Sequence, residues 1–461
     1  MTIPPAPPSD RPSLAIVGGT VVTMNAARAI VRADVLIEDG VIRAVAAPGG
    51  PLPDGARVLD ARGRTIVPGL VQAHLHLCQT LFRGLAEERP LLAWLRERIW
   101  PLEAAHDAAS LRASARLGLC ELLLSGTTAI LDMGTVHHTE QLFLAAEESG
   151  IRFTGGQALM DRGVGVPPGL LQPTDAALAE SDALRARWDG AAGGRLRYAY
   201  APRFILSCSE PLLQAVVERA RAGARVHTHA AEQREEVAAV RAELGRGDLE
   251  YFAQIGLTGP NLVLAHCVWV EEADIAELAR SGTHVTHCPA SNMKLASGLA
   301  PVRELRRRGV NVALGADGAA CSNRLDAWGQ LWLAALLASV RDGPGALHAA
   351  EVFELATLGG ARALGLADEI GSVEPGKRAD LVLVDLTRHE PDGDPYSQLV
   401  YSARPEDVRT VVVDGRVVVE EGRLLTLNPA AVRAEARAAR DALVARTGIA
   451  PPTSAPKKPQ A

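Results

Sequence analysis

Histidines end two strand-like segments of the chain at a spacing that suits a metal ion. His74 and His76 are two residues apart in GLVQAHLHL, and His227 and His229 are two residues apart in VHTHAAE. Side chains at positions i and i+2 of a β-strand point to the same face, so each pair can hold one ion with its ring nitrogens. For the second pair, the spacing leaves open which histidine binds.

A histidine and two carboxylates stand in comparable places. His266 closes NLVLAHCV, Asp317 follows the apolar run NVALGA, and Glu232 comes three residues after His229. Each has an ordinary structural explanation on its own: a core histidine, a helix N-cap, a solvated glutamate. A buried carboxylate such as Asp317 needs a partner, however. Strand ends that present His-x-His, His, His and Asp in this order predict one shared site.

The ligand set suits a single divalent ion. Three histidine nitrogens and one carboxylate oxygen are typical of Zn²⁺, and Fe²⁺ is the alternative. No lysine occurs between His76 and His229, so the modified lysine that bridges two metals on a middle strand in some barrel hydrolases is absent, and we expect one ion. Such an ion lowers the pKa of bound water from about 15.7 to about 7 and produces hydroxide at neutral pH.

If this hydroxide attacks a substrate, three residues are expected to transfer the protons and stabilise the charge of that reaction. Asp317 would take a proton from the attacking water, and Glu232 would deliver one to a ring nitrogen of the substrate and later to the departing amine. His266 would orient the water or stabilise the tetrahedral adduct.

The segments that carry these residues alternate with longer amphipathic stretches. Strand–helix alternation over about 300 residues predicts parallel strands, and the number of repeats favours an α/β protein with a (β/α)8 TIM-type barrel. No G-x-G-x-x-G follows an early strand, which argues against a doubly wound dinucleotide-binding sheet. Barrel active sites lie at the carboxyl ends of the strands, which is where the histidines and carboxylates stand.

The sequences at both ends of the chain are typical of short β-strands. Alternating β-branched runs surround the hairpin signals Asp39-Gly40 and Asp414-Gly415. They predict one flanking β-sandwich domain built from both chain ends, with two unrelated appendages as the alternative. The expected division is a disordered tail at 1–12, the β-sandwich at 13–67 plus 368–428, the barrel at 68–367, a C-terminal helix at 429–450 and a second disordered tail at 451–461.

Composition narrows the class of protein. The 461 residues are 48% hydrophobic and 22% charged with a net charge of −6, as in a soluble enzyme that acts on a small molecule and without the basic field that attracts nucleic acid. No apolar run reaches the roughly 20 residues of a membrane helix, and no signal peptide is recognised. The six cysteines form no C-x-x-C pair and are expected to be reduced thiols of a cytoplasmic protein.

The motifs resemble the amidohydrolase superfamily, in particular its branch of metal-dependent deaminases and chlorohydrolases. The similarity runs from about residue 14 to 425 and includes PGLVQAHLHL, VHTHAAE, LAHCVWV, HCPASNMKLASGLAPV and LGADGAA. It implies the same barrel with a β-domain, homo-oligomers in some relatives, and His229 rather than His227 as a ligand. The implied metal ligands are His74, His76, His229 and Asp317, and the implied catalytic groups are Glu232, His266 and Asp317.

Residues that would bind the substrate resemble two groups of deaminases. In FRGLAEERPLLAWLRERIWPLE, Trp94 and Glu103 match the tryptophan and the ribose-binding glutamate of methylthioadenosine/S-adenosylhomocysteine deaminases. Gln79 and Arg203 instead resemble the glutamine and arginine that guanine deaminases direct at an oxopurine. A guanidinium only donates hydrogen bonds, so it suits a carbonyl oxygen, which adenine lacks. Structural alternatives are pairing of Arg203 with Glu103 or Glu210, a loop-capping Gln79 and simple packing of Trp94.

The resemblance implies a hydrolytic deaminase. We expect it to release ammonia from an adenosine-type nucleoside (methylthioadenosine, S-adenosylhomocysteine or 5′-deoxyadenosine), to which Glu232 would also bind. Guanine, another oxopurine or a pterin is the alternative substrate, followed by hydrolysis of an s-triazine. A non-catalytic barrel used for assembly is the alternative from another class, but no expected metal ligand is missing.

The remaining histidines have weaker signals. His284 and His287 are expected to be structural or to support the site from behind its ligands, with a role as ligands as the alternative, and His287 could hydrogen-bond near the site. We expect His137 and His138 either to line the mouth of the pocket or to lie in a solvated loop. The last three are expected at the surface: His106, His348 and His389.

Overall fold

The computed structural model describes residues 13–389 and 393–451. The predicted tail at 1–12 and all but the first residue of the one at 451–461 lie outside the described residues. Within them, no helix is long and apolar enough to cross a membrane. All six cysteines are buried and none forms a disulfide.

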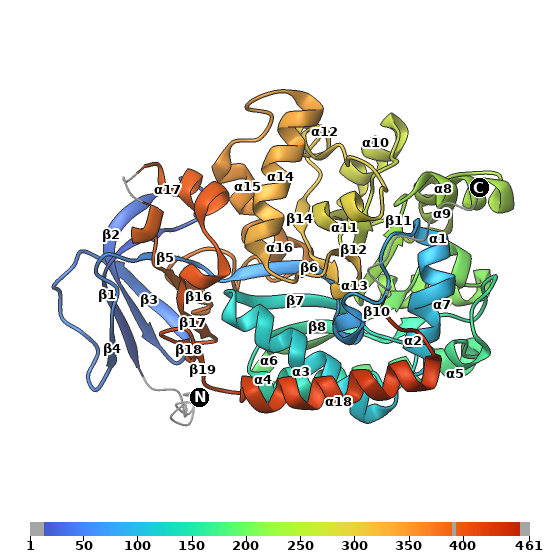
Figure 1. The fold of residues 1–461 in the computed structure, drawn as a ribbon. Coiled ribbons are helices and arrows are strands. Elements are labelled where there is room, and N and C mark those ends of the chain that lie inside the picture. The colour runs from blue at the N-terminus through green and yellow to red at the C-terminus, as the bar shows by residue number, and fades with distance from the viewer. Residues whose placement is uncertain (1–12, 390–392, 452–461) are drawn as a thin grey trace, which may run out of the picture.

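A closed parallel barrel forms the centre of the molecule (Figure 1). Neighbouring strands in the order of the chain pair in parallel. The short β15 (Asp317–Gly318), which directly follows the last of them, pairs with the first, so the sheet closes on itself. The predicted (β/α)8 barrel is confirmed. Its strands are β6 (Leu70–His76), β7 (Thr127–Met133), β8 (Arg152–Gly156), β10 (Leu196–Pro202), β11 (Arg225–Ala230), β12 (Leu262–His266), β13 (His284–His287) and β14 (Val312–Leu314), with β9 (Ala158–Leu159) beside β10.

Helices surround the barrel, and their apolar faces pack on strands that are buried almost throughout. The helices are α1 (Leu91–Trp94), α2 (Trp100–Ala104), α3 (Ala108–Leu124), α4 (Glu140–Ser149), α5 (Thr174–Trp188), α6 (Ala191–Gly194), α7 (Glu210–Arg221), α8 (Arg234–Leu244), α9 (Asp248–Ile255), α10 (Glu272–Ser281), α11 (Pro289–Lys294), α12 (Val302–Arg307), α13 (Ala319–Ser322), α14 (Ala327–Asp342), α15 (Ala349–Leu355), α16 (Leu358–Ala363) and α17 (Pro395–Ser397). The last helix, α18 (Pro429–Thr447), runs along the outside of α3.

The two chain ends meet in one mixed sheet beside the barrel. The joining pair is antiparallel, with Thr65 of the N-terminal part opposite Val384 of the C-terminal part. Both predicted Asp-Gly hairpin turns have the expected positive φ, so a β-domain from both ends is confirmed. The strands are β1 (Leu14–Val22), β2 (Ile30–Glu38), β3 (Val41–Ala46), β4 (Arg57–Asp60), β5 (Thr65–Pro68), β16 (Leu381–Val384), β17 (Val408–Val413), β18 (Arg416–Glu420) and β19 (Arg423–Leu424).

A buried ion pair joins the barrel to this sheet. Arg152 at the start of β8 donates two hydrogen bonds of 3.0 Å to the carboxylate of Asp380, just before β16. Asp380 also accepts a hydrogen bond of 2.8 Å from the backbone N–H of Asp414. Because both charged groups are buried, removing one would leave the other uncompensated.

We therefore expect Arg152→Ala to lower the free energy of unfolding by about 3–5 kcal/mol, the usual cost of breaking a buried pair. Urea denaturation of the purified protein measures it. The matched control is Arg62→Ala, which removes an arginine from an exposed pair with Asp60 and should change stability little. Equal effects of the two substitutions would contradict the structural role of the buried pair.

Candidate active site

Three histidines converge at the carboxyl ends of two barrel strands. His74 and His76 lie on β6 and His229 on β11, and one ring nitrogen of each lies within 4.8 Å of the others. The Nε2 atoms of His76 and His229 are 3.3 Å apart. Two nitrogens this close, with few polar neighbours, need a shared proton or a shared cation. The structure thus brings together the three histidines that the sequence predicted.

The backbone orients the lone pairs of this cluster. The Nδ1–H of His76 donates to the carbonyl oxygen of Met133 (2.9 Å), and that of His229 donates to the carbonyl oxygen of Arg203 (2.7 Å). Nδ1 of His74 is hydrogen-bonded to Nε2 of His227 (2.8 Å). With Nδ1 occupied in each ring, every Nε2 is left to face the centre, as is usual for histidines that bind a metal. His227 therefore lies behind His74 rather than in the cluster.

Asp317 closes the cluster from the last strand. Its Oδ1 lies 3.3 Å from Nε2 of His74 and 3.4 Å from Nε2 of His76. Its Oδ2 accepts a hydrogen bond of 2.6 Å from the hydroxyl of Ser291. Asp317 also has a left-handed backbone (φ 62°), a strained conformation that is common at functional sites. The Nε2 atom of His74, which is buried, has no hydrogen-bond partner among the described residues, so the donor set fits one divalent cation.

His266 and Glu232 adjoin the cluster, and the ring of His266 lies 5.3 Å from that of His74 and 5.4 Å from that of His229, centroid to centroid. Nε2 of His266 is 3.5 Å from Glu232 and 4.0 Å from Asp317. The Nδ1–H of His266 donates to the side-chain oxygen of Asn292 (2.9 Å), which turns Nε2 toward the site. Burial, and then the neighbouring Asp317 carboxylate, raise the pKa of Glu232 well above its usual value. Glu232 is therefore suited to carry a proton at neutral pH.

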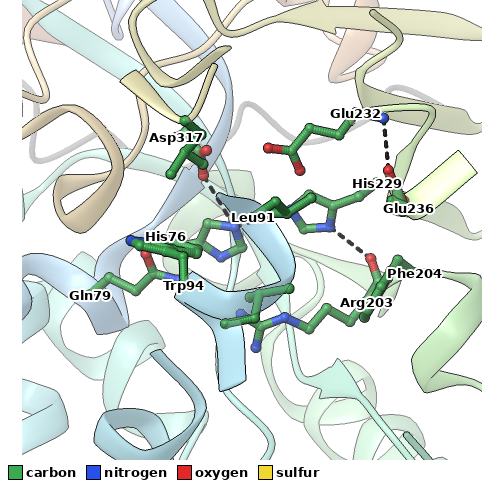
Figure 2. A pocket seen from close by; sticks show the side chains of 12 residues that line it. His76, Gln79, Leu91, Trp94, Arg203, Phe204, His229, Glu232, Glu236 and Asp317 are labelled. Atoms are coloured by element: carbon green, nitrogen blue, oxygen red, sulfur yellow. Dashed lines mark hydrogen bonds and ion pairs between the residues drawn. The ribbon is translucent and has the colours of Figure 1, made fainter. Parts of the chain in front are cut away.

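A cavity opens over these residues (Figure 2). The polar part of the cavity is formed by three members of the cluster (His76, His229 and Asp317) together with Glu232 and Arg203. Leucines and aromatic rings form its apolar part. The buried Nε1–H of Trp94 has no partner among the described residues, so it could donate to a ligand. The lining residues are His76, Gln79, Leu91, Trp94, Leu95, Arg203, Phe204, His229, Glu232, Glu236, Leu295 and Asp317.

Arg203 and Glu103 form a buried ion pair at the cavity. The guanidinium of Arg203 donates to both carboxylate oxygens of Glu103, at 2.5 and 3.0 Å. Gln79 also donates to this carboxylate through Nε2 (3.0 Å), so it does not merely cap its loop. Its Oε1 occupies the space that a Cβ on Gly318 would fill. Burial alone would raise the pKa of Glu103, but the Arg203 guanidinium holds it below the usual value. Arg203 thus pairs with Glu103 rather than with Glu210.

The remaining histidines lie outside the cluster. The expectation that His106 lies at the surface is wrong. His106 is buried, and its ring nitrogens are hydrogen-bonded to the carbonyl oxygen of Cys78 and the hydroxyl of Ser110, which compensates the loss of water. His348 is exposed as expected. His389 is half-buried and paired with Asp407 at 2.8 Å. The other four do not line the cavity. His137 is half-buried and His138 is exposed. His284, the first residue of β13, is half-buried, and His287, its last residue, is buried.

Sequence reasoning assigned no role to two polar residues of the site. Ser291 and Asn292 are completely buried and bond to Asp317 and His266. The sequence signal was HCPASN, which places two small polar residues within a few positions of the end of β13, in α11. The carbonyl oxygens of Met133 and Arg203 have no comparable signal, because every residue carries a carbonyl.

The fold and the site together define a barrel hydrolase with a cluster of histidines and an aspartate at its strand ends. The family model described as "Amidohydrolase family" matches residues 65–418, and the chain belongs to this family.

Similar proteins cover most of the chain. It is 39% identical over 434 residues to a 5′-deoxyadenosine deaminase of Methanothermobacter thermautotrophicus, covering 93% of this chain and 98% of the relative. It is 40% identical over 416 residues to a 5-methylthioadenosine/S-adenosylhomocysteine deaminase of Symbiobacterium thermophilum, covering 88% and 94%. Among solved structures, an adenosine deaminase from Xanthomonas campestris with bound zinc has a TM-score of 0.88 and 33% identity, covering 95% of this chain and 100% of that one.

Proposed function

We propose that the protein is a hydrolytic deaminase of adenosine-type nucleosides, which replaces the exocyclic amine by oxygen and releases ammonia. The single observation that carries the proposal is the set of converging Nε2 atoms beside Asp317 and a buried Glu232. Relatives named as deaminases of 5′-deoxyadenosine and methylthioadenosine support the adenosine part.

His74, His76, His229 and Asp317 would hold one divalent cation, which we propose is Zn²⁺ because three imidazoles and a carboxylate suit it. When bound, the cation acidifies water and so supplies a nucleophile at neutral pH. We also propose that the protein works in the cytoplasm, where six free thiols stay reduced.

The chain's own groups would carry the protons. Asp317 would accept the proton of the attacking water at its carboxylate. Glu232, whose pKa is raised by burial, would donate its proton to a ring nitrogen of the purine. It would then receive the proton that Asp317 took from the water and donate it to the leaving amine. As the C–N bond breaks, the hydroxyl of the adduct would return a proton to Glu232. His266, held by Asn292, would stabilise the negative charge that develops on the tetrahedral adduct.

Arg203 favours a second candidate, a free oxopurine or pterin. A carboxylate has about four acceptor positions. Arg203 and Gln79 use three of those of Glu103, and the thiol of Cys78 also donates to its Oε1 at 3.9 Å. Two ribose hydroxyls could therefore bind there only if Gln79 moves. The N–H groups of Arg203 that remain would suit the carbonyl oxygen of an oxopurine.

Ammonia release decides between the candidates. We expect the purified protein to deaminate 5′-deoxyadenosine, methylthioadenosine or S-adenosylhomocysteine faster than guanine, pterin or an aminotriazine. A preference for guanine or pterin would replace the first candidate by the second, and hydrolysis of the triazine alone would exclude both.

If Glu103 binds the ribose, Glu103→Gln should lower kcat/KM for adenosine about 10- to 100-fold, since a hydrogen bond to a charged group contributes about 1.5–3 kcal/mol. The loss for adenine should be much smaller because adenine has no ribose. Steady-state kinetics with both substrates measure this. The control is Glu97→Gln, at an exposed glutamate six residues away, and equal losses for adenosine and adenine would reject the ribose contact.

A further inference from the structure

A charged groove adjoins the catalytic cavity. The groove has a volume of about 600 Å³, and its lining includes Arg89, Arg234, Trp269 and Leu295. Leu295 also lines the cavity, so the groove and the cavity share a wall. The groove is lined by residues of the loop that precedes α1 and of the loop that follows α11.

Gln233 holds these two loops together. Its Oε1 accepts a hydrogen bond of 3.1 Å from the backbone N–H of Leu91, and its Nε2 donates one of 3.0 Å to the carbonyl oxygen of Leu295. Both leucines line the cavity, whereas Gln233 lines the groove. A carboxamide donates through its NH₂ group and accepts through its oxygen, so the single side chain of Gln233 can bond to both backbone groups. Gln233 is buried and directly follows Glu232. The two hydrogen bonds that separate the cavity from the groove therefore lie beside the proposed proton donor.

The groove beyond Gln233 offers charges of both signs. The guanidinium of Arg234 lies 4.1 Å from the centroid of the Trp269 ring, and among the described residues the exposed Arg234 has no ion-pair partner. Stacking leaves its N–H groups free for a carboxylate in the guanidinium plane. Glu88 and Glu235 also line the groove and could pair with an ammonium group. An amino-acid zwitterion therefore matches the groove but not the cavity.

We propose that Gln233 is a specificity-determining residue, which closes the cavity toward the charged groove and so selects nucleosides with a short, uncharged 5′ substituent. This rests on the proposed function, since it concerns the 5′ end of an adenosine-type substrate. The three nucleosides share the adenine base and the ribose ring and differ only in the substituent on the 5′ carbon. This substituent is hydrogen in 5′-deoxyadenosine, a methylthio group in methylthioadenosine and a long amino-acid chain in S-adenosylhomocysteine. The long chain would need the groove and thus the loss of both Gln233 hydrogen bonds.

The experiment compares kcat/KM for the three nucleosides. We expect the wild-type protein to use S-adenosylhomocysteine at least about tenfold less well than 5′-deoxyadenosine, and we expect Gln233→Ala to raise the ratio of the first to the second at least about tenfold. Adding Arg234→Gln to Gln233→Ala should reverse part of this gain, because the zwitterion would then lose its carboxylate partner.

Control measurements distinguish a role of Gln233 in substrate selection from a role in stabilising the two loops. Gln214→Ala, at an exposed glutamine of α7, should leave the ratio unchanged, and metal content and thermal unfolding show that each variant is folded. A wild-type protein that uses S-adenosylhomocysteine as well as 5′-deoxyadenosine overturns the proposal, even if the variant does not fold. Equal losses for all three nucleosides in Gln233→Ala also overturn it. If the wild-type protein deaminates none of the three, the proposed function fails before the variants are compared.

Discussion

Glu232→Gln is expected to reduce kcat for the preferred nucleoside by about 10²–10⁴-fold, the usual contribution of a positioned general acid or base. The amide has the same size and can still accept a hydrogen bond from the hydroxyl of Ser297, which lies 3.5 Å from Glu232. It has no acidic proton to give to the ring or to the leaving amine. Single-turnover and steady-state measurements of ammonia release determine the change.

Two readouts show whether the loss is chemical. Glu232 is not among the residues proposed to hold the cation, so the variant should bind as much metal as the wild-type protein. The dissociation constant of the deaminated product should change little, because the product needs no proton from this side chain. The matched control is Glu250→Gln, at an exposed glutamate of α9, which should leave kcat unchanged. Activity of Glu232→Gln within a few-fold of wild type would reject the proton-transfer role.

The fold could be predicted because its signals are local and repeated. The strand–helix alternation and the two Asp-Gly turns each depend on short stretches of sequence, and the structure has a barrel and a shared β-domain accordingly. The convergence of the cluster followed from one rule, that the carboxyl ends of barrel strands meet at one face. Alternation also placed His74 and His76 together, and the structure brings both beside His229.

Contacts between distant segments were harder to predict. Spacing could not separate His227 from His229, since both lie on one face of β11 and only the position of His74 decides which one is nearer the centre. His106 gave no sign of burial, because its partners are a carbonyl oxygen on another segment and a serine hydroxyl. The pairing of Arg203 with Glu103 remained one of several alternatives, since a hundred residues separate the two.

The pair on β11 also offers the sharpest test of the proposed cation site. His229→Gln should abolish stoichiometric metal binding and lower kcat by about 10³-fold or more, because the remaining groups cannot supply the charge stabilisation that an ion contributes. His227→Gln should instead weaken metal affinity about 10- to 100-fold, as expected for a residue that orients a ligand. Its activity should return when excess Zn²⁺ is added.

Both substitutions replace a histidine of β11 by glutamine, at positions two residues apart. A general loss of stability would therefore affect both variants. Metal content after dialysis, measured by elemental analysis, separates them without reference to activity. The geometry requires that His229 matter more, since its Nε2 faces that of His76 at 3.3 Å while the Nε2 of His227 is bonded to Nδ1 of His74. If His227→Gln loses the metal irreversibly while His229→Gln retains it, the assignment is reversed. If both variants keep one ion and full activity, the histidine cluster is not the site of the reaction.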